Sequence, residues 1–361
     1  MIDATLADVV LERTIELAGI PAPTGFEGNR AALVRSWWSE DGLGDVRLDA
    51  TGNVWACARG GDGDAVVLCA HIDTVFGAGQ PHVTRMDGPR LHGPSVGDDA
   101  VGVAALSAAT SLLDARGRPV WLLASVGEEG LGNLCGVSAA LDAPPVPVGA
   151  LVAVEGNYLG RVSAIGVGSV RRRYTVKGPG GHAWEASDAP SAVHAVAGLV
   201  CDIAAMPSID GTSVNVGRLG GGEGINVRSR EAWFELDLRA DEPAKLAALA
   251  RDVDGIIATI GEPLSVERMV LGDRPAGRLD PTHPLVRAAG DALREAGIVA
   301  QPVATSTDAN AAHARGIPAI AIGITTGSGE HTPQEWIDTA PIPDGVRTLA
   351  RTVARYEELS A

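Results

Sequence analysis

The chain has 361 residues, 45% of them hydrophobic and 20% charged, so it is long enough for two globular domains with sizeable cores. Its net charge of −16 at pH 7 disfavours nucleic acid and anionic membrane surfaces as partners. The first residues lack the basic start and apolar core of a signal peptide, and no apolar run approaches the roughly 20 residues of a membrane span. We therefore expect a cytoplasmic protein without a membrane partner.

The first 166 residues alternate between helical and strand-like patterns. Apolar residues at helical spacing predict helices over residues 4–18 and 27–38. Strand-like runs follow at residues 52–58, 65–72 and 119–125, and a helical pattern covers residues 101–115. Strands that alternate with helices favour a sheet with parallel strands that is covered on both faces.

The order of elements changes from about residue 167 to residue 272. The patterns predict two helices, over residues 190–206 and 241–260, and four strands, over residues 172–178, 212–219, 232–240 and 264–271. This is the β-α-β-β-α-β order of a ferredoxin-like domain. The glycine-rich segment 217–226 lacks the spacing of a phosphate-binding loop, so we interpret it as a hairpin loop.

The first pattern then resumes, with a helix over residues 284–297, a strand over 317–323 and a closing helix from residue 344. The sequence thus predicts an α/β fold in which residues 1–166 and 273–361 form one mixed-sheet domain. Residues 167–272 form a smaller domain inserted into it.

Several predicted strands are followed by an acid or a histidine. His71 and Asp73 come at the end of one strand and share one of its faces, because residues i and i+2 of a strand point the same way. Glu128 and Glu129 follow the strand 119–125. Glu155 ends the strand-like run 150–156, and His331 follows the strand at 317–323.

Asp98 and Asp99 lie between a glycine-rich turn and a predicted helix, so either one could simply cap the helix N-terminus. Together with the strand-end residues, however, they form a set of imidazoles and carboxylates without a thiolate. Such a set suits zinc, cobalt or manganese. The ligand count fits two ions with a bridging carboxylate, the arrangement of two-metal hydrolases.

With these motifs the sequence resembles the co-catalytic zinc metallopeptidases and deacylases, a family that includes acetylornithine deacetylase, succinyl-diaminopimelate desuccinylase, glutamate carboxypeptidase and the aminotripeptidases. The resemblance implies a zinc-exopeptidase-like catalytic domain with an inserted lid that pairs two chains into a homodimer. It implies two divalent ions, zinc in the first place, with cobalt or manganese as alternatives. His71 and Glu155 would hold one ion, Glu129 and His331 the other, and Asp98 would bridge them.

The resemblance also assigns three catalytic residues. Asp73 would orient the His71 ring, and Glu128 would be the general base that takes a proton from the bridging water. His182, in the segment KGPGGHAW, would steady the developing oxyanion, in the partner subunit's site. The alternative for His182 is a turn histidine that caps a helix of the lid.

Four further residues match substrate-binding positions of the family. Asn226 and Arg239 would bind the polar end of the substrate, because an arginine fork suits a carboxylate. The alternative for Arg239 is an ion pair with a neighbouring aspartate of its strand. Thr307 and Asp308 would line the substrate pocket, although a helix N-cap explains them nearly as well.

From this resemblance we expect the chain to be an enzyme, a metal-dependent hydrolase that cleaves an amide bond of short peptides as an exopeptidase of the di- or tripeptidase kind. The first alternative is an N-acyl amino acid deacylase, because the resemblance associates a glutamate at position 155 with carboxypeptidases and deacylases. An alternative of another class is a non-catalytic protein that binds a small molecule on the same fold. It is disfavoured because neither Glu128 nor any ligand residue is missing.

Overall fold

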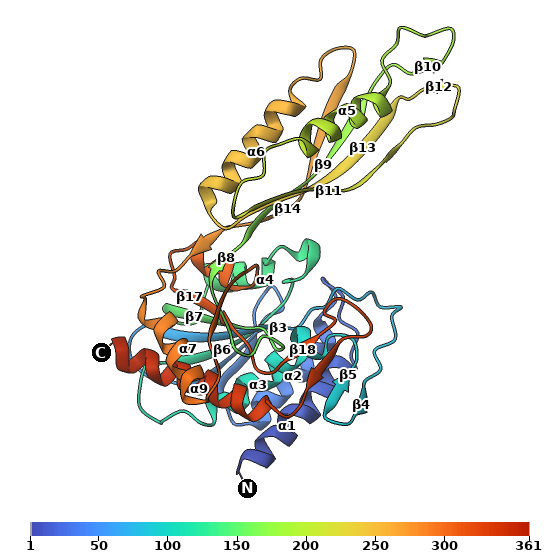
Figure 1. The fold of residues 1–361 in the computed structure, drawn as a ribbon. Coiled ribbons are helices and arrows are strands. Elements are labelled where there is room, and N and C mark those ends of the chain that lie inside the picture. Colours follow the sequence, from blue (N-terminus) through green and yellow to red (C-terminus); the bar gives the residue numbers. More distant parts are fainter. Residues whose placement is uncertain (1, 361) are drawn as a thin grey trace. The chain divides into compact units, whose positions relative to one another are not determined.

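A computed structural model describes residues 2–360 of the chain (Figure 1). The chain divides into two compact units. The first contains the residues up to Gly166 and those from Arg278 onwards, and the second is Val167–Gly277. No helix within residues 2–360 is long and apolar enough to cross a membrane.

A nine-stranded mixed sheet forms the centre of the first unit. Its strands follow the order β1 (Gly44–Leu48), β2 (Val54–Arg59), β6 (Val120–Ser125), β3 (Ala65–His71), β7 (Val148–Val154), β17 (Ala319–Ile322), β8 (Arg161–Gly166) and β15 (Gly277–Arg278), and β16 (Gln301–Thr305) pairs with β8. Every residue of β3 and β6 is buried. This explains why these strands read as continuous apolar runs rather than as an alternation of apolar and polar residues.

Strand β3 marks a switch point in the order of the sheet. It runs parallel to both of its neighbours, β6 and β7. The chain passes from β3 to β6 on one side and afterwards to β7 on the other, so loops leave the carboxyl ends of these strands in opposite directions. In open α/β sheets the crevice at such a point is where ligands bind. His71 is the last residue of β3.

Helices cover both faces of this sheet (Figure 1). Leu68 and its alternate neighbours pack against α1 (Ile2–Ala18), α2 (Gly28–Glu40), α3 (Val101–Thr110), α7 (Pro284–Glu295) and α9 (Ile342–Ser360). Cys69 and the residues that alternate with Leu68 face α4 (Cys135–Asp142) and α8 (Ala309–His313). His71 continues the Cys69 face to the end of the strand.

A small antiparallel sheet brings two distant segments of the first unit together. It contains β4 (Arg85–Asp87), β5 (Arg90–His92), β18 (Gly327–Ser328) and β19 (Trp336–Asp338). Because β19 pairs with β5, the loop between β18 and β19 lies beside the segment that follows β5. The backbone N–H of Gly93 donates to the Glu335 carbonyl at 2.9 Å.

The second unit has the predicted β-α-β-β-α-β order. Its antiparallel sheet has the order β11 (Thr212–Gly221), β13 (Glu231–Ala240), β9 (Gly168–Lys177) and β14 (Ser265–Arg274), and α5 (Ala192–Ala204) and α6 (Pro243–Ile257) pack against it. The prediction missed the short pair β10 (Gly181–His182) and β12 (Val227–Arg228), because two-residue strands have no detectable periodicity. It also missed α4, α8 and several short strands of the first unit.

Candidate metal centre

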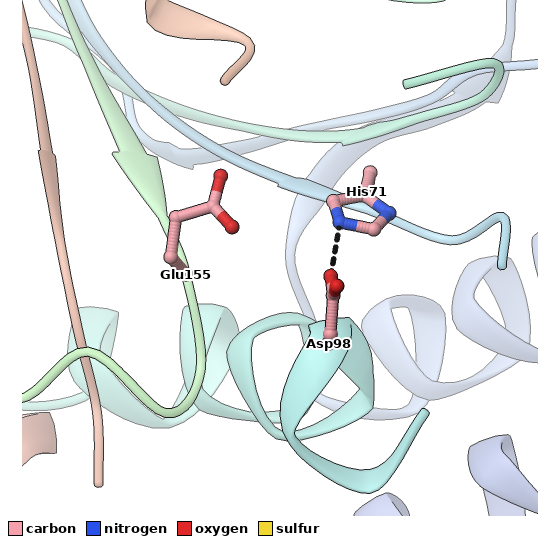
Figure 2. A group of neighbouring side chains, drawn as sticks. All are labelled: His71, Asp98 and Glu155. Atoms are coloured by element: carbon pink, nitrogen blue, oxygen red, sulfur yellow. Dashed lines mark hydrogen bonds and ion pairs between the residues drawn. The ribbon is translucent and has the colours of Figure 1, made fainter. Parts of the chain in front are cut away.

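His71 lies at the carboxyl end of β3, where a buried strand opens into a loop. Its ring is 2% exposed, and its Nδ1 lies 3.2 Å from the carbonyl oxygen of Asp73 and 3.5 Å from the carboxylate Oδ1 of the same residue. Its Nε2 lies 2.9 Å from Oδ1 of Asp98. Figure 2 shows His71 and Asp98 in contact, with the Glu155 carboxylate on the neighbouring strand end directed toward the same space.

The Asp73 carboxylate organises the loop after β6. It accepts hydrogen bonds from the backbone N–H groups of Glu128 at 3.0 Å and Glu129 at 2.9 Å, and from the Thr24 hydroxyl at 2.8 Å. Burial alone would raise the pKa of Asp73, but the hydrogen bond and charge of His71 and the N–H donors lower it overall. One ionised carboxylate therefore orients both the His71 ring and the two glutamates.

Asp98 lies in a tight turn before α3. The turn residues Asp98 and Asp99 have non-helical backbone angles, and the helix starts at Val101 with Ala100 at the capping position. Neither aspartate therefore caps α3 with its side chain, which was the alternative that the sequence left open. Asp98 Oδ1 faces His71, and its Oδ2 lies 3.1 Å from Nε2 of His331. Its two oxygens thus point to two different imidazoles, as a bridging carboxylate requires.

Asp99 holds the backbone of the same site. Its buried carboxylate accepts the backbone N–H groups of Gly156 at 2.8 Å and His71 at 3.3 Å. A side chain at position 102 would collide with it, because a Cβ there would lie 2.0 Å from Asp99 Oδ1. Asp99 therefore joins the end of β3 to the residue that follows Glu155.

His331 reaches the site from the loop between β18 and β19. The sequence predicted His331 just after the strand at 317–323, but β17 ends at Ile322 and the short strand β18 lies between them. His331 Nε2 lies 3.2 Å from Oε1 of Glu129. Its hydrogen bonds to Asp98 and Glu129 raise the pKa of His331 to about 10.

The described residues 2–360 contain three groups whose ligand atoms lie within 4.8 Å of one another. The groups are His71 with Asp98 and Glu155, Asp98 with Glu129 and His331, and His71 with Glu128 and Glu129. The structure thus brings all five predicted ligands together with Glu128, and Asp98 belongs to two groups.

The donor set fits divalent ions. It contains nitrogen and oxygen atoms without a thiolate, which is the chemistry that zinc, cobalt and manganese accept. Burial, and then the charges of Asp99 and Glu128, raise the pKa of Glu155 well above its usual value, although the charge of His71 opposes the rise. So many buried carboxylates in one place need positive charge beside them, and bound cations would supply it.

The predicted residues of the second unit belong to none of these groups. His182 is exposed in β10, and its Nδ1 accepts the Trp184 N–H at 3.3 Å. Asn226 is exposed in the loop before β12. Arg239, in β13, donates from Nε to Asp237 at 3.0 Å, which is the ion pair that the sequence analysis named as the alternative.

Thr307 and Asp308 precede α8 and are both buried. The Thr307 hydroxyl accepts the Ala309 N–H at 3.2 Å, as a cap does, whereas the Asp308 side chain makes no capping bond. Asp308 Oδ2 lies 2.5 Å from the Ser125 hydroxyl and 3.1 Å from Sγ of Cys69. Its carboxylate thus contacts the side chains of β3 and β6, and burial raises its pKa.

Two buried charged residues near this site, Arg30 and Glu335, were not predicted from the sequence. Arg30 is fully buried and donates to the carbonyls of Ile20 at 2.8 Å and Ile72 at 3.1 Å and to the Ser95 hydroxyl at 2.8 Å. Glu335 is also fully buried. The signal for Arg30 was present, because it lies four and eight residues before Val34 and Trp38 on the apolar face of α2.

Comparison with known proteins agrees with this geometry. The sequence profile described as "Peptidase family M20/M25/M40" matches residues 67–355, which is most of the chain. The chain belongs to this peptidase family. The family resemblance drawn from the sequence is thereby confirmed, and the protein is a hydrolase of amide bonds. No curated protein sequence matches the chain significantly.

Solved structures share the fold over nearly the whole chain. Aminopeptidase PepT from Bacillus cereus is 20% identical with a TM-score of 0.81, over 98% of this chain and 99% of its own. A tripeptidase from Staphylococcus aureus is 18% identical with a TM-score of 0.84, over the same shares of 98% and 99%. The YXEP protein from Bacillus subtilis, described as a dinuclear metal-binding peptidase, is 19% identical with a TM-score of 0.70, again over 98% and 99%. At these identities the likeness establishes the fold.

Proposed function

We propose that the protein is a dinuclear metallopeptidase that removes a terminal residue from short peptides. The observation that carries this proposal is the Asp98 carboxylate, whose two oxygens face His71 on one side and His331 on the other. His71 and Glu155 would hold one divalent ion, and Glu129 and His331 the other. The ions would polarise the scissile carbonyl and acidify a bound water.

Glu128 is the proposed general base. Its carboxylate lies in the candidate group with His71 and Glu129, and its backbone N–H is held by Asp73. A base beside the ligands that is not itself needed as a ligand can take the water proton and pass it to the leaving amine. Asp73 keeps His71 oriented by accepting from the ring nitrogen that faces away from Asp98.

Peptides are the proposed substrates because solved structures of this fold include an aminopeptidase and a tripeptidase. The second candidate is hydrolysis of N-acyl amino acids, which Glu155 favours and which needs the same metal chemistry. A non-catalytic binding protein is the weaker alternative, because the proposed base and all five proposed ligands lie together.

The remaining assignments stay predictions. They comprise zinc as the metal, a homodimer formed through the second unit, His182 acting in the partner's site, a cytoplasmic location, and substrate contacts from Asn226, Arg239, Thr307 and Asp308. The exposed position of His182 supports a role outside its own unit.

The function is tested by supplying the purified protein with zinc, manganese or cobalt and a panel of di- and tripeptides and N-acyl amino acids. Release of a free amine from peptides supports the peptidase, and release from N-acyl amino acids alone supports the deacylase. Binding of these compounds without any turnover, at full metal occupancy, would favour the non-catalytic alternative.

A further inference from the structure

Glu335 places a carboxylate against the backbone of the Asp98 turn. Its Oε1 accepts the N–H groups of Gly97 at 2.7 Å and Asp98 at 2.8 Å, and its Oε2 accepts the N–H of Ser95 at 2.8 Å. A carboxylate that accepts three backbone N–H groups is held in one orientation, and it holds the turn in return. Residues about 240 positions apart in the chain are joined here.

Glu335 acts as an acceptor toward the turn through both of its oxygens. Oε1 accepts two backbone N–H groups and Oε2 accepts one. The Glu335 carboxylate also lies close to the backbone of Gly97, since a Cβ added at Gly97 would lie 2.9 Å from Oε1.

Glu335 is connected to His331 through its own loop. The Glu335 N–H donates to the Thr332 carbonyl at 3.2 Å, and the Thr332 N–H donates to the Gly329 carbonyl at 3.1 Å, which closes a tight turn around His331. The His331 backbone has a positive φ of 62° inside this turn, where most side chains are disfavoured. The position of His331 therefore depends on the same loop that presents Glu335.

Arg30 extends the connection to the end of β3. It donates to the Ser95 hydroxyl and to the carbonyl of Ile72, the residue between His71 and Asp73. The buried Arg30 guanidinium and the buried Glu335 carboxyl group thus meet at Ser95, Arg30 at the hydroxyl and Glu335 at the backbone N–H. Together they contact all three segments that present His71, Asp98 and His331.

We infer that Glu335 is a positioning residue that fixes the positions of Asp98 and His331 relative to each other, and that Arg30 links both of them to His71. The inference rests on the proposed function, because it assigns Asp98 and His331 as metal ligands. Glu335 contacts Asp98 only through its backbone N–H, so it acts through these ligands rather than on the substrate.

The test is metal binding by Glu335→Gln. An amide of the same size places an NH₂ group against at least one backbone N–H, so the turn has to move. We expect the ion held by His331 to bind about 10- to 100-fold more weakly, as is typical when a partner of a ligand is lost. Titration of metal-free protein with Co²⁺, followed by calorimetry and by the visible spectrum, measures both affinities and the ligand geometry. His331→Ala and Glu155→Ala identify which transition belongs to which ion.

Glu357→Gln is the matched control. Glu357 also accepts a backbone N–H, that of Arg118 at 2.9 Å, and it pairs with Arg59, but it lies at the amino end of β6, the end of the strand opposite to the one that carries the site. It should leave both affinities and the cobalt spectrum unchanged. Wild-type affinities and spectrum in Glu335→Gln would overturn the inference.

Glu335→Asp keeps the test decisive if the glutamine variant does not fold. Aspartate retains the charge and both oxygens but is one methylene too short for all three N–H groups, so an intermediate loss of affinity supports the inference. Unchanged affinities in the aspartate variant would overturn it. Failure of the wild-type protein to bind two ions would instead contradict the proposed function, whatever the variants do.

Discussion

The two units hold their predicted functional residues in opposite ways. In the first unit His71, Asp73, Glu128 and Glu129 are buried and are tied to one another by hydrogen bonds. In the second unit His182 and Asn226 are exposed, and Arg239 pairs with Asp237 of its own strand. A buried cluster that is held by its own hydrogen bonds suits bond cleavage, because its groups need little rearrangement during the reaction. Exposed residues suit contacts made only when a substrate or a second chain is present.

Metal removal should have the largest effect, and it tests whether the buried cluster is a metal centre at all. Dialysis against a chelator should abolish amide hydrolysis, and zinc, cobalt or manganese should restore it, because the ligands alone supply no electrophile. Metal content and activity are measured on the same samples. Full activity in protein that has verifiably lost its metal would show that hydrolysis does not depend on a metal centre in the buried cluster.

The next effect separates two adjacent glutamates within the cluster. Glu128→Ala should lower kcat by about 10²- to 10⁴-fold with both ions retained, because it removes the base. Glu129→Ala should instead lower the occupancy of one ion, because Glu129 contacts His331. Metal analysis and steady-state kinetics distinguish the two. Equal metal loss in both variants would mean that Glu128 is itself a ligand.

The sequence predicted the parts of this cluster that follow directly from strands. His71 and Glu155 were visible because apolar runs end at them and the strands are buried on both faces. His331 was harder to place, because a short hairpin separates it from the strand that was expected to deliver it. For Asp98 the local pattern alone left a helix cap open, since it did not show the non-helical turn, and only the family resemblance predicted a bridging carboxylate.

Arg30 and Glu335 show what local patterns leave out. A buried charge is tolerated only where distant groups satisfy it, and those groups come from three separate segments of the chain. Periodicity places Arg30 on an apolar helix face but cannot name its partners. In the second unit the ferredoxin-like order was predictable because strands such as β13 alternate regularly. No local pattern specifies whether Arg239 binds a substrate.

A smaller effect tests whether Arg239 recognises the substrate. If it binds a substrate carboxylate, amidation of that carboxylate should cost about 1.5 to 3 kcal/mol in kcat/KM, roughly 10- to 150-fold, and Arg239→Ala should add little on the amidated substrate. Arg171→Ala is the matched control, because Arg171 also pairs with Asp237, at 3.7 Å. Equal losses of kcat/KM in the two arginine variants would mean that Arg239 has a structural role in the sheet rather than a role in substrate binding.

A further experiment tests whether two chains share an active site, and it is read as the activity recovered in mixed dimers. If His182 serves a partner's site, mixed dimers of Glu128→Ala and His182→Ala carry both defects in one site and none in the other. Random exchange at equal amounts gives half mixed dimers, so about a quarter of wild-type activity should return. Each variant incubated alone is the control. Proven exchange without any recovery would confine His182 to its own chain or exclude it from catalysis.

The smallest effect concerns Asp308, which lies in the first unit but was predicted to bind substrate. Its carboxylate is 2% exposed and already contacts Ser125 and Cys69, so we expect Asp308→Asn to change kcat/KM by less than about fivefold. Stability should respond instead. Burial raises the pKa of Asp308, so the folded state binds its proton more tightly than the unfolded state.

The contribution of Asp308 to the free energy of unfolding of the wild type should therefore fall as the pH rises from about 4 through the raised pKa, by at most about 1.4 kcal/mol per pH unit. Asp308→Asn lacks this decline, so its stability relative to wild type should increase with pH. Urea unfolding of both proteins between pH 4 and pH 8, in chelator, measures the difference. Ser125→Ala is the control in the other direction: it removes a hydrogen bond that favours the ionised carboxylate, so its stability relative to wild type should decrease as the pH rises. A raised KM in Asp308→Asn, with no pH-dependent gain in stability, would instead support the prediction that Asp308 binds substrate.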